Sequence, residues 1–267
     1  MNYSLGKLLG EGAFGEVYIG KDTKTGEVVA IKQFDIYRKK YWNHELSILE
    51  KLPINIHLPR LIGSYKEDVD YLYIISNFIS GTEFARYQNS TPISKRRSPD
   101  MLSVVNSLAT QMLDALKTLH SVGIVHRDVK QENIMYDPKT ITFVLIDVGG
   151  ACDSRGCLEP AGTAELLHPD LVEAYELFDN GYETDLPSDI EIYKRGDVYS
   201  LGIVLFEFVE EQAPYTPIRT RSSYRVYDFT KQNEVTYFDP KLNRIIDLMI
   251  TGTHNADDII YEFTRTI

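Results

Sequence analysis

The stretch "IVHRDVKQENIM" (residues 124–135) decides how the whole sequence is interpreted. Its two ends are apolar, whereas its centre holds His126, Arg127, Asp128, Lys130, Glu132 and Asn133. A surface loop does not need apolar flanks, and a strand inside a core would not tolerate so many charged groups. The pattern therefore predicts a polar site that is held between two buried flanks.

The composition limits the kind of protein that can carry this site. The chain has 267 residues, of which 43% are hydrophobic, and this suits one large domain or two small lobes. Its formal charge is 28 − 39 = −11, so we expect no nucleic-acid partner, because such proteins are normally basic. No signal peptide is visible, and no apolar stretch reaches the ~18 residues of a membrane span. We expect a soluble, intracellular protein without membrane contact.

Periodicity predicts a small β-rich part followed by a larger helical part. We expect strands at 16–20, 27–32 and 71–79 and helices over 43–52, 101–120 and 198–209. The last helix is apolar almost all round, which is typical of a helix buried inside a larger domain. The joint between the two parts falls near residues 77–82.

Two stretches look like insertions into this layout. Residues 84–99 contain "SKRRSP" and no acidic residue, and we expect an exposed loop there. Residues 173–191 contain seven acidic residues and no Lys or Arg. The acidic stretch is either an inert, solvated loop or a surface that favours basic substrates.

The stretch "LGEGAFGEV" (9–17) spaces Gly10, Gly12 and Gly15 as G-x-G-x-x-G. Glycines allow the backbone to approach phosphates closely and to offer its N–H groups. In dinucleotide-binding folds such glycines open a helix, but here they lead into a predicted strand, which excludes that fold. An ordinary glycine-rich hairpin turn remains the alternative unless further motifs follow.

Further motifs do follow. Lys32 ends the strand "VVAIK", Glu45 begins "ELSIL" on the next helix, and Asp147 ends an apolar strand 19 residues after Asp128. A glycine loop, strand Lys, helix Glu, H-R-D-x-K-x-x-N and D-x-G in this order resemble the eukaryotic-type protein kinase family. The resemblance extends from Leu9 to at least Val209, and Lys130 with Thr163 is the pattern of its Ser/Thr branch.

The resemblance implies an α+β, two-lobed protein kinase fold. It places one kinase domain over 1–267, with a β-rich N-lobe (1–76), a hinge (77–81) and a mostly helical C-lobe (82–267). The implied activity is transfer of the γ-phosphoryl group of ATP to Ser or Thr hydroxyls of protein substrates, with Mg²⁺ bound to the phosphates. We expect a monomer with protein substrates, and the acidic stretch leaves open whether these substrates are basic.

The resemblance also assigns roles to individual residues. Asp128 would accept the proton of the substrate hydroxyl, and Lys32, oriented by Glu45, would hold the phosphates. The implied catalytic residues are Asp128, Lys130, Lys32 and Glu45, and the implied Mg²⁺ ligands are Asn133 and Asp147. The implied nucleotide contacts are Lys32 with Leu9, Gly10, Glu11, Gly12, Ala13, Phe14, Gly15, Glu16, Val17, Ala30, Asn77, Phe78, Ile79 and Met135. Ser76 would guard the back of the adenine pocket, His126 would be structural, and Asp197 would brace the loop.

The sequence departs from the family pattern at Val148, where Phe is usual, and at Asp170, where Glu usually pairs with a late Arg. No Arg lies between Arg244 and Arg265, so we expect that ion pair to be missing. The small Val148 side chain is expected to weaken the packing with Leu49, Leu61 and His126. Asp147 and Gly149 remain, so we expect an altered balance between active and inactive states and not a loss of activity. The alternative function is a pseudokinase that binds nucleotide without transfer. A kinase-fold enzyme for a small molecule is disfavoured by "GTAELLHPD" (162–170), which resembles a peptide-receiving segment.

The segment before Gly162 raises two further hypotheses. Residues 155–162 contain no Ser, Thr or Tyr, so Glu159 could offer a fixed negative charge to Arg127 in place of a phosphate. Cys152 and Cys157 are the only cysteines. Two unrelated thiols are the favoured interpretation, because the expected compartment is reducing, and a redox switch is the alternative.

Overall fold

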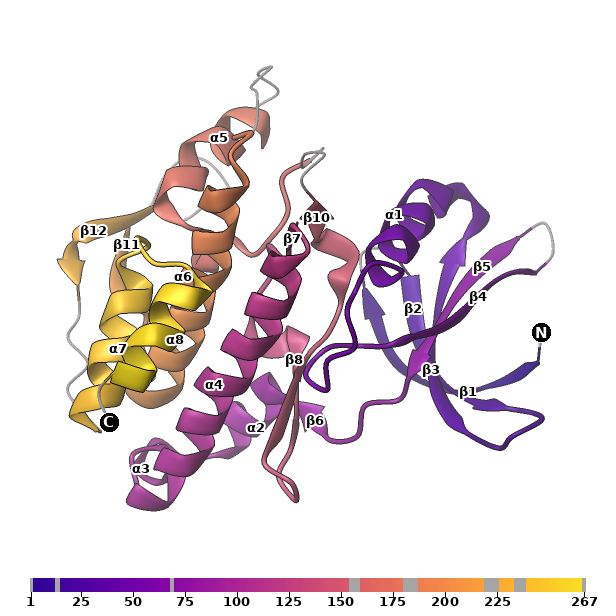
Figure 1. The fold of residues 1–267 in the computed structure, drawn as a ribbon, viewed down its shortest axis with the longest axis horizontal. Helices are drawn as coiled ribbons and strands as arrows, with labels where there is room; N and C mark the ends of the chain where they lie inside the picture. Colours follow the sequence, from indigo (N-terminus) through magenta and orange to yellow (C-terminus); the bar gives the residue numbers. More distant parts are fainter. Residues whose placement is uncertain are drawn as a thin grey trace.

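The structure is a computed structural model, and it describes residues 2–12, 15–67, 70–153, 159–179, 187–218, 226–232 and 239–265. Figure 1 shows two parts that lie side by side, a twisted sheet with one helix and a larger, mainly helical part. The predicted α+β, two-lobed layout is confirmed. Residues 77–81, the predicted hinge, run from the sheet into the helical part.

The first part is an antiparallel sheet with the strand order β1-β2-β3-β5-β4. Its strands are β1 (Tyr3–Gly12), β2 (Gly15–Asp22), β3 (Val28–Asp35), β4 (Leu61–Glu67) and β5 (Tyr71–Asn77). Helix α1 (Lys39–Leu49) follows a short 3-10 turn (Ile36–Arg38) and packs beside the sheet. In β3, Val29 and Ile31 are buried on one face, so the period-2 pattern that predicted the strand reflects this packing.

The helical part contains α2 (Phe84–Ser90), α3 (Ile93–Arg96), α4 (Pro99–Ser121), α5 (Pro169–Asp179), α6 (Ile190–Glu210), α7 (Pro240–Ile250) and α8 (Ala256–Arg265). Three small sheets accompany these helices. They pair β7 (Ile124–Val125) with β10 (Cys152–Asp153), β8 (Ile134–Asp137) with β6 (Thr82–Glu83) and β9 (Thr142–Leu145), and β11 (Tyr215–Ile218) with β12 (Val226–Gln232).

The two long helices match their predictions. α4 begins with Pro99 at its first turn and buries the predicted apolar stripe, including Val105, Leu108 and Met112. α6 is buried along almost its whole length, and the Asp189 side chain caps it by accepting a hydrogen bond from the Glu191 N–H. In the described part of the chain, no helix combines the length and the apolar character that crossing a membrane requires.

The prediction of an exposed loop over residues 84–99 is wrong. The stretch forms α2 and α3 and ends in the first residue of α4. Phe84 is fully buried, and the buried Arg96 donates hydrogen bonds to the carbonyl oxygens of Thr91 and Gln88. The Arg96 guanidinium also lies over the Phe208 ring. The basic composition of residues 84–99 was misleading. A long Arg side chain can be buried when backbone carbonyl oxygens accept its hydrogen bonds and an aromatic ring covers it.

The inert-loop interpretation of residues 173–191 fails for the described residues. Residues 173–179 belong to α5, where Tyr175 is buried, and α6 begins at Ile190. Residues 180–186 lie outside the described residues. The favoured interpretation of the cysteines is also wrong, because Cys152 is disulfide-bonded. The other cysteine, Cys157, lies outside the described residues.

Candidate active site

The stretch 124–135 forms a polar loop between buried strands, as predicted. Ile124 and Val125 in β7 and Ile134 at the start of β8 are fully buried. Arg127 has a φ of 67°, an unfavourable backbone conformation for a residue other than glycine. The Asp197 carboxylate of α6 holds this loop, accepting hydrogen bonds from the backbone N–H groups of His126 (2.8 Å) and Arg127 (2.7 Å). The predicted bracing role of Asp197 is confirmed.

Three polar side chains, two from the loop of residues 124–135 and one from Thr163, surround the Asp128 carboxylate. The Asp128 carboxylate accepts a hydrogen bond from Asn133 Nδ2 (2.8 Å) and lies 2.8 Å from Lys130 Nζ. Its other oxygen accepts a hydrogen bond from Thr163 Oγ1 (2.9 Å). Lys130 also donates to the Thr163 hydroxyl (3.3 Å). A carboxylate that is fixed in this way is oriented for accepting a hydrogen bond from an incoming hydroxyl group.

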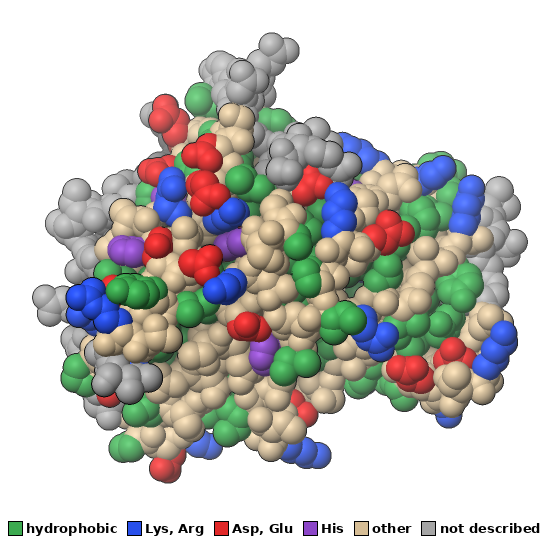
Figure 2. All heavy atoms as spheres, in the orientation of Figure 1, with side chains coloured by type: hydrophobic (Ala, Val, Ile, Leu, Met, Phe, Trp, Pro, Cys, Tyr) green, Lys and Arg blue, Asp and Glu red, His purple; other side chains and the backbone are tan. Residues whose placement is uncertain are grey.

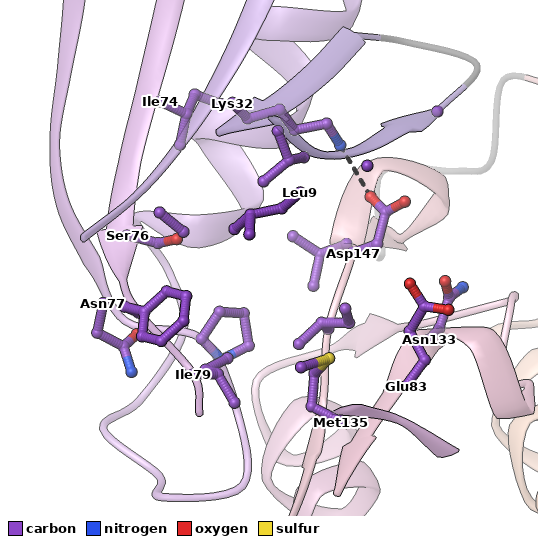
Figure 3. A pocket seen from close by; sticks show the side chains of 18 of the residues that line it. Leu9, Lys32, Ile74, Ser76, Asn77, Ile79, Glu83, Asn133, Met135 and Asp147 are labelled. Atoms are coloured by element: carbon purple, nitrogen blue, oxygen red, sulfur yellow. Dashed lines mark hydrogen bonds and ion pairs between the residues drawn. The ribbon is translucent and has the colours of Figure 1, made fainter. Parts of the chain in front are cut away.

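Lys32 of β3 lies between two carboxylates from different elements. Its Nζ is 2.7 Å from Glu45 Oε2 of α1 and 2.9 Å from Asp147 Oδ1, the second contact being drawn in Figure 3. Burial alone would lower the pKa of Lys32, but the two carboxylates raise it above its ordinary value. Lys32 is therefore a permanently charged ammonium group in a fixed position.

The two carboxyl groups differ in their electrostatics. Burial raises the pKa of Glu45, and the Lys32 ammonium offsets only part of that effect. Burial acts in the same direction on Asp147, but Lys32 and the Gly149 N–H hold the pKa of Asp147 below its ordinary value. Asp147 is thus the more readily ionised of the two.

A cavity between the sheet and the helical part is lined by most of the predicted nucleotide contacts (Figure 3). Val17 of β2, Ala30 of β3 and Ser76 of β5 line it from the sheet, and Met135 of β8 lines it from the helical part. The predicted residues that line it are Leu9, Gly10, Glu11, Gly12, Gly15, Val17, Ala30, Lys32, Glu45, Asn77, Phe78, Ile79, Asn133, Met135 and Asp147. One chain therefore brings together groups from distant positions in the sequence.

Some predicted residues do not line this cavity. Glu16 is the neighbour of the lining residues Gly15 and Val17 in β2, and its carboxylate instead accepts a hydrogen bond from the Tyr18 hydroxyl (2.6 Å). Alternate residues of a strand face opposite sides, which explains the difference. Ala13 and Phe14 lie outside the described residues. Asp128 and Lys130 do not line the cavity but contact it through Asn133.

The structure adds lining residues that the sequence did not reveal. Ile74, Pro59 and Glu83 line the same cavity, and the Glu83 carboxylate pairs with Arg86 Nε at 2.9 Å. Ile74 lies opposite Lys32 in the β3–β5 register, so only strand pairing could have identified it. Glu83 follows the predicted hinge, but a single acidic residue after a turn carries no recognisable signal.

Val148 is fully buried in the core with Leu49, and Leu61 packs against the same core. His126 is also fully buried, and its Nε2 lies 3.1 Å from the Ile146 carbonyl oxygen. The predicted structural role of His126 is therefore confirmed. Val148 is thus covered by neighbouring apolar groups, whereas Asp147 is exposed and Gly149 is half-buried.

The hypothesis that the Glu159 carboxylate pairs with Arg127 is wrong. Arg127 Nη1 donates to the main-chain oxygen of Glu159 (2.7 Å), and Arg127 Nε donates to the Gly150 oxygen (2.8 Å). The Glu159 carboxylate instead pairs with Lys40 of α1. Two carbonyl groups satisfy the guanidinium, which leaves the side chain of Glu159 available for another element.

His168 holds the end of the segment 162–170, close to Asp170, for which the sequence predicted a missing ion pair. His168 Nε2 lies 2.9 Å from the Gly252 oxygen, and its Nδ1 accepts a hydrogen bond from the Asp170 N–H (3.1 Å). Because Nδ1 accepts, the proton lies on Nε2, and the ring is neutral. Burial lowers the pKa of His168, which agrees with this tautomer. His168 thus joins the start of α5 to the turn between α7 and α8.

Asn133 and Asp147 offer oxygen donors of the kind that Mg²⁺ prefers. The side-chain NH₂ group of Asn133 donates hydrogen bonds to Asp128, so the side-chain oxygen Oδ1 is the atom of Asn133 that can coordinate a metal ion. Asp147 follows Ile146, whose N–H donates to the main-chain oxygen of Asn133 (2.8 Å), so the backbone brings Asp147 next to Asn133. The donor set of one carboxylate and one amide oxygen fits a Mg²⁺ ion that keeps water or phosphate as its other ligands.

The comparisons with known proteins agree on one family. A family model described as "Protein kinase domain" matches residues 3–256. The chain is 26% identical over 265 residues to a protein named "Aurora kinase" from Dictyostelium discoideum, covering 95% of this chain and 62% of that protein. It is 30% identical over 233 residues to the "Aurora kinase" of Yarrowia lipolytica, covering 84% of this chain and 56% of that protein.

A similar solved structure is described as Rad53 1-466 in complex with AMP-PNP, with a TM-score of 0.69 at 20% identity. The match covers 97% of this chain and 64% of that one, and it supports the fold. The chain spans 40% to 62% of the length of the curated relatives it matches.

Proposed function

This chain belongs to the protein kinase family, and from that premise we propose that it is an active Ser/Thr kinase that uses ATP. The observation that carries the proposal is that Lys32 and Asp147 line one cavity between the sheet and the helical part, and that Asp128 is hydrogen-bonded to Asn133 of the same lining. Glu45 and Asn133 complete the set of polar groups that phosphoryl transfer requires. A pseudokinase would typically lack at least one of them.

The proposed reaction is an in-line transfer. Asp128 accepts the proton of the substrate hydroxyl as its oxygen bonds to the γ-phosphorus, and the bond to the β-phosphate oxygen breaks with its electron pair leaving on ADP. Lys130 offsets negative charge on the transferred group, and Lys32, held by Glu45, positions the other phosphates. The work of the protein is thus positioning and charge stabilisation.

Mg²⁺ would be held by Asn133 and Asp147, and its charge would offset that of the phosphate oxygens. Val17, Ala30 and Met135 would enclose the adenine, and the backbone of residues 77–79 would hydrogen-bond to its edge. The small Ser76 side chain leaves the back of that pocket open. The lobes would comprise residues 1–76 and 82–267 with the hinge at 77–81, and the monomer would be sufficient, because one chain lines the cavity.

A preference for basic protein substrates is part of the proposal. Three carboxyl groups lie next to the catalytic loop: burial raises the pKa of Glu207, and the charges of Glu132 and Glu165 raise it further. Glu207 accepts a hydrogen bond from Gln131 Nε2 (2.8 Å), which fixes it beside residues 131–133. A Lys or Arg side chain of a substrate would relieve this repulsion.

The test measures phosphate transfer from ATP to matched peptides that differ in the flanking charge and in the acceptor, which is Ser, Thr or Tyr. We expect transfer to Ser and Thr in basic contexts and a loss of at least roughly a hundredfold in kcat for Asp128→Asn. Equal transfer by the wild type and Asp128→Asn would contradict the proposal. Nucleotide binding without transfer by the wild type would select the pseudokinase instead.

A further inference from the structure

Helix α1, which carries Glu45, begins with an electrostatic mismatch. Its first turn holds Lys39 and Lys40 and no acidic residue, and its N-cap, Arg38, makes no side-chain cap hydrogen bond. A helix N-terminus carries a partial positive charge, so basic side chains there are unfavourable. No acidic side chain in the first turn offsets this cost, so a carboxylate from another segment would be favourable here.

Glu159 supplies that carboxylate from 119 positions along the chain. Its Oε1 lies 2.5 Å from Lys40 Nζ, and the hydrogen bond and charge of Glu159 raise the pKa of Lys40. The Lys40 and Glu159 side chains are 63% and 47% exposed. The pair is therefore accessible to salt, and its strength depends on ionic strength.

The main chain of Glu159 contacts a second functional element. Its carbonyl oxygen accepts the hydrogen bond from Arg127 Nη1, and Arg127 directly precedes Asp128. One residue therefore touches α1 through its side chain and the catalytic loop through its backbone. A displacement of Glu159 would therefore change its contacts with both α1 and Arg127.

Other contacts join α1 to the segment that follows Asp147. His44 Nε2 lies 2.6 Å from the Ala151 oxygen, and Lys51, just beyond α1, lies 2.6 Å from Asp153 Oδ2. Lys40 and His44 are four positions apart and so lie on one face of the helix. In Figure 1, α1 lies next to β10, which contains Asp153. The Lys40–Glu159 pair adds a contact at the N-terminal end of α1.

We propose that the Lys40–Glu159 ion pair is a positioning contact for phosphoryl transfer, holding α1 so that Glu45 stays on Lys32. The inference rests on the proposed function and specifies how its site is kept assembled. It requires no modification of the neighbouring segment, because residues 155–162 contain no hydroxyl side chain. Lys40 and Glu159 are positioning residues and do not touch the reacting atoms.

The experiment compares Lys40→Met, Glu159→Gln and the double charge exchange K40E/E159K with the wild type. Steady-state kcat and KM for ATP are measured in low and high salt, together with hydrogen exchange of residues 41–49. We expect each single variant to lower kcat/KM for ATP roughly three- to tenfold. Glu159→Gln, which leaves the Lys40 charge at the helix N-terminus without this carboxylate, should also speed exchange in α1. The exchanged pair should restore kcat/KM to within about twofold, and high salt should bring the wild type towards the single variants.

Lys117→Met is the matched control. Lys117 pairs with Asp257 at 2.7 Å, with side chains 50% and 70% exposed, and this pair joins α4 to α8. The control should leave kcat, KM and the exchange of α1 unchanged. If the wild type is active and both single variants equal it, or the exchanged pair restores nothing, the inference is wrong.

Two further results separate this inference from the proposed function. If the wild type is no more active than Asp128→Asn, the proposed function is wrong, independently of how α1 is positioned. A loss of more than about tenfold in wild-type activity after phosphatase treatment would overturn the claim that the contact needs no modification; unchanged activity supports it.

Discussion

The carboxylate of Asp197 fixes the backbone of the catalytic loop. It is almost fully buried, and besides the N–H groups of His126 and Arg127 it accepts a hydrogen bond from His120 Nε2 at 2.9 Å. Three donors share one carboxylate, and two of them belong to a backbone with an unfavourable φ at Arg127. Strain of this kind persists only where the surroundings hold it, and Asp197 is what holds it here.

Asp197→Ala should therefore disrupt the backbone conformation of the loop more strongly than it disrupts the nucleotide pocket. Leaving the buried donors without their acceptor should lower the free energy of unfolding by about 3–5 kcal/mol. We expect kcat to fall at least roughly tenfold, with a smaller change in nucleotide affinity, because Asp197 does not line the cavity. Denaturant unfolding and nucleotide titration measure the two effects.

Asp114→Ala is the control for this change. Asp114 of α4 is exposed and accepts a hydrogen bond from Asn55 Nδ2 (2.7 Å), and its loss should cost less than about 1 kcal/mol. Equal destabilisation by the two variants, or full activity in Asp197→Ala, would refute the bracing role.

At the scale of elements, the start of α5 and the turn between α7 and α8 are fitted to each other. Gly252 has a φ of 71°, which only glycine adopts without cost, and an added Cβ would collide with Nε2 of His168. The His168 ring also meets Tyr199 of α6 edge-on, with ring centroids 5.4 Å apart. His168 thus contacts three helical regions beneath the segment that is proposed to receive the peptide.

Gly252→Ala should lower the free energy of unfolding by about 2–4 kcal/mol, from the backbone conformation and the overlap together. His168→Ala should cost about 2–3 kcal/mol through lost hydrogen bonds and packing. In the double variant the overlap with the ring is absent, so the total should be smaller than the sum. Strictly additive costs in urea unfolding would argue against this contact.

His168 also makes the free energy of unfolding depend on pH. Because burial lowers the pKa of His168 in the folded state, its stabilising contribution is complete above the ordinary His pKa of about 6.5. That contribution is lost as the pH falls towards the lower folded pKa. Asp170 and Arg195 also act on the ring, the first raising its pKa and the second lowering it. His168→Gln should therefore be less sensitive than the wild type to acid between pH 6.5 and the folded pKa.

The sequence predicted those elements whose signal is local. Lys32, Glu45 and Asp147 were found because each occupies a fixed place in a short motif, and the long helices because their apolar spacing is regular. The helices of residues 84–99 were missed, since Arg96 is buried by a ring that lies 112 positions away. His168 with Gly252 was missed for the same reason, because a backbone oxygen as a distant partner leaves no pattern in the chain.

At the scale of the whole molecule, the proposed nucleotide pocket spans both parts of the fold. Val17 and Lys32 come from the sheet, whereas Met135 and Asp147 come from segments of the helical part. The Lys32–Asp147 contact already joins the two parts at 2.9 Å. A ligand in this cavity would therefore stabilise both parts at once, and its binding energy should appear in the unfolding of the entire chain.

A thermal-unfolding measurement with a non-hydrolysable ATP analogue tests this coupling. At a hundred times Kd the analogue should add about 2.7 kcal/mol, a rise in Tm of roughly 5–10 °C for a chain of this size. The rise should depend on Mg²⁺, because without the ion the phosphate charges face the ionised Asp147. Asp147→Asn should lose most of the Mg²⁺ dependence while still binding the analogue. The same rise with and without Mg²⁺ in the wild type would contradict the proposed metal ligands, and no rise at all would exclude the cavity as a nucleotide site.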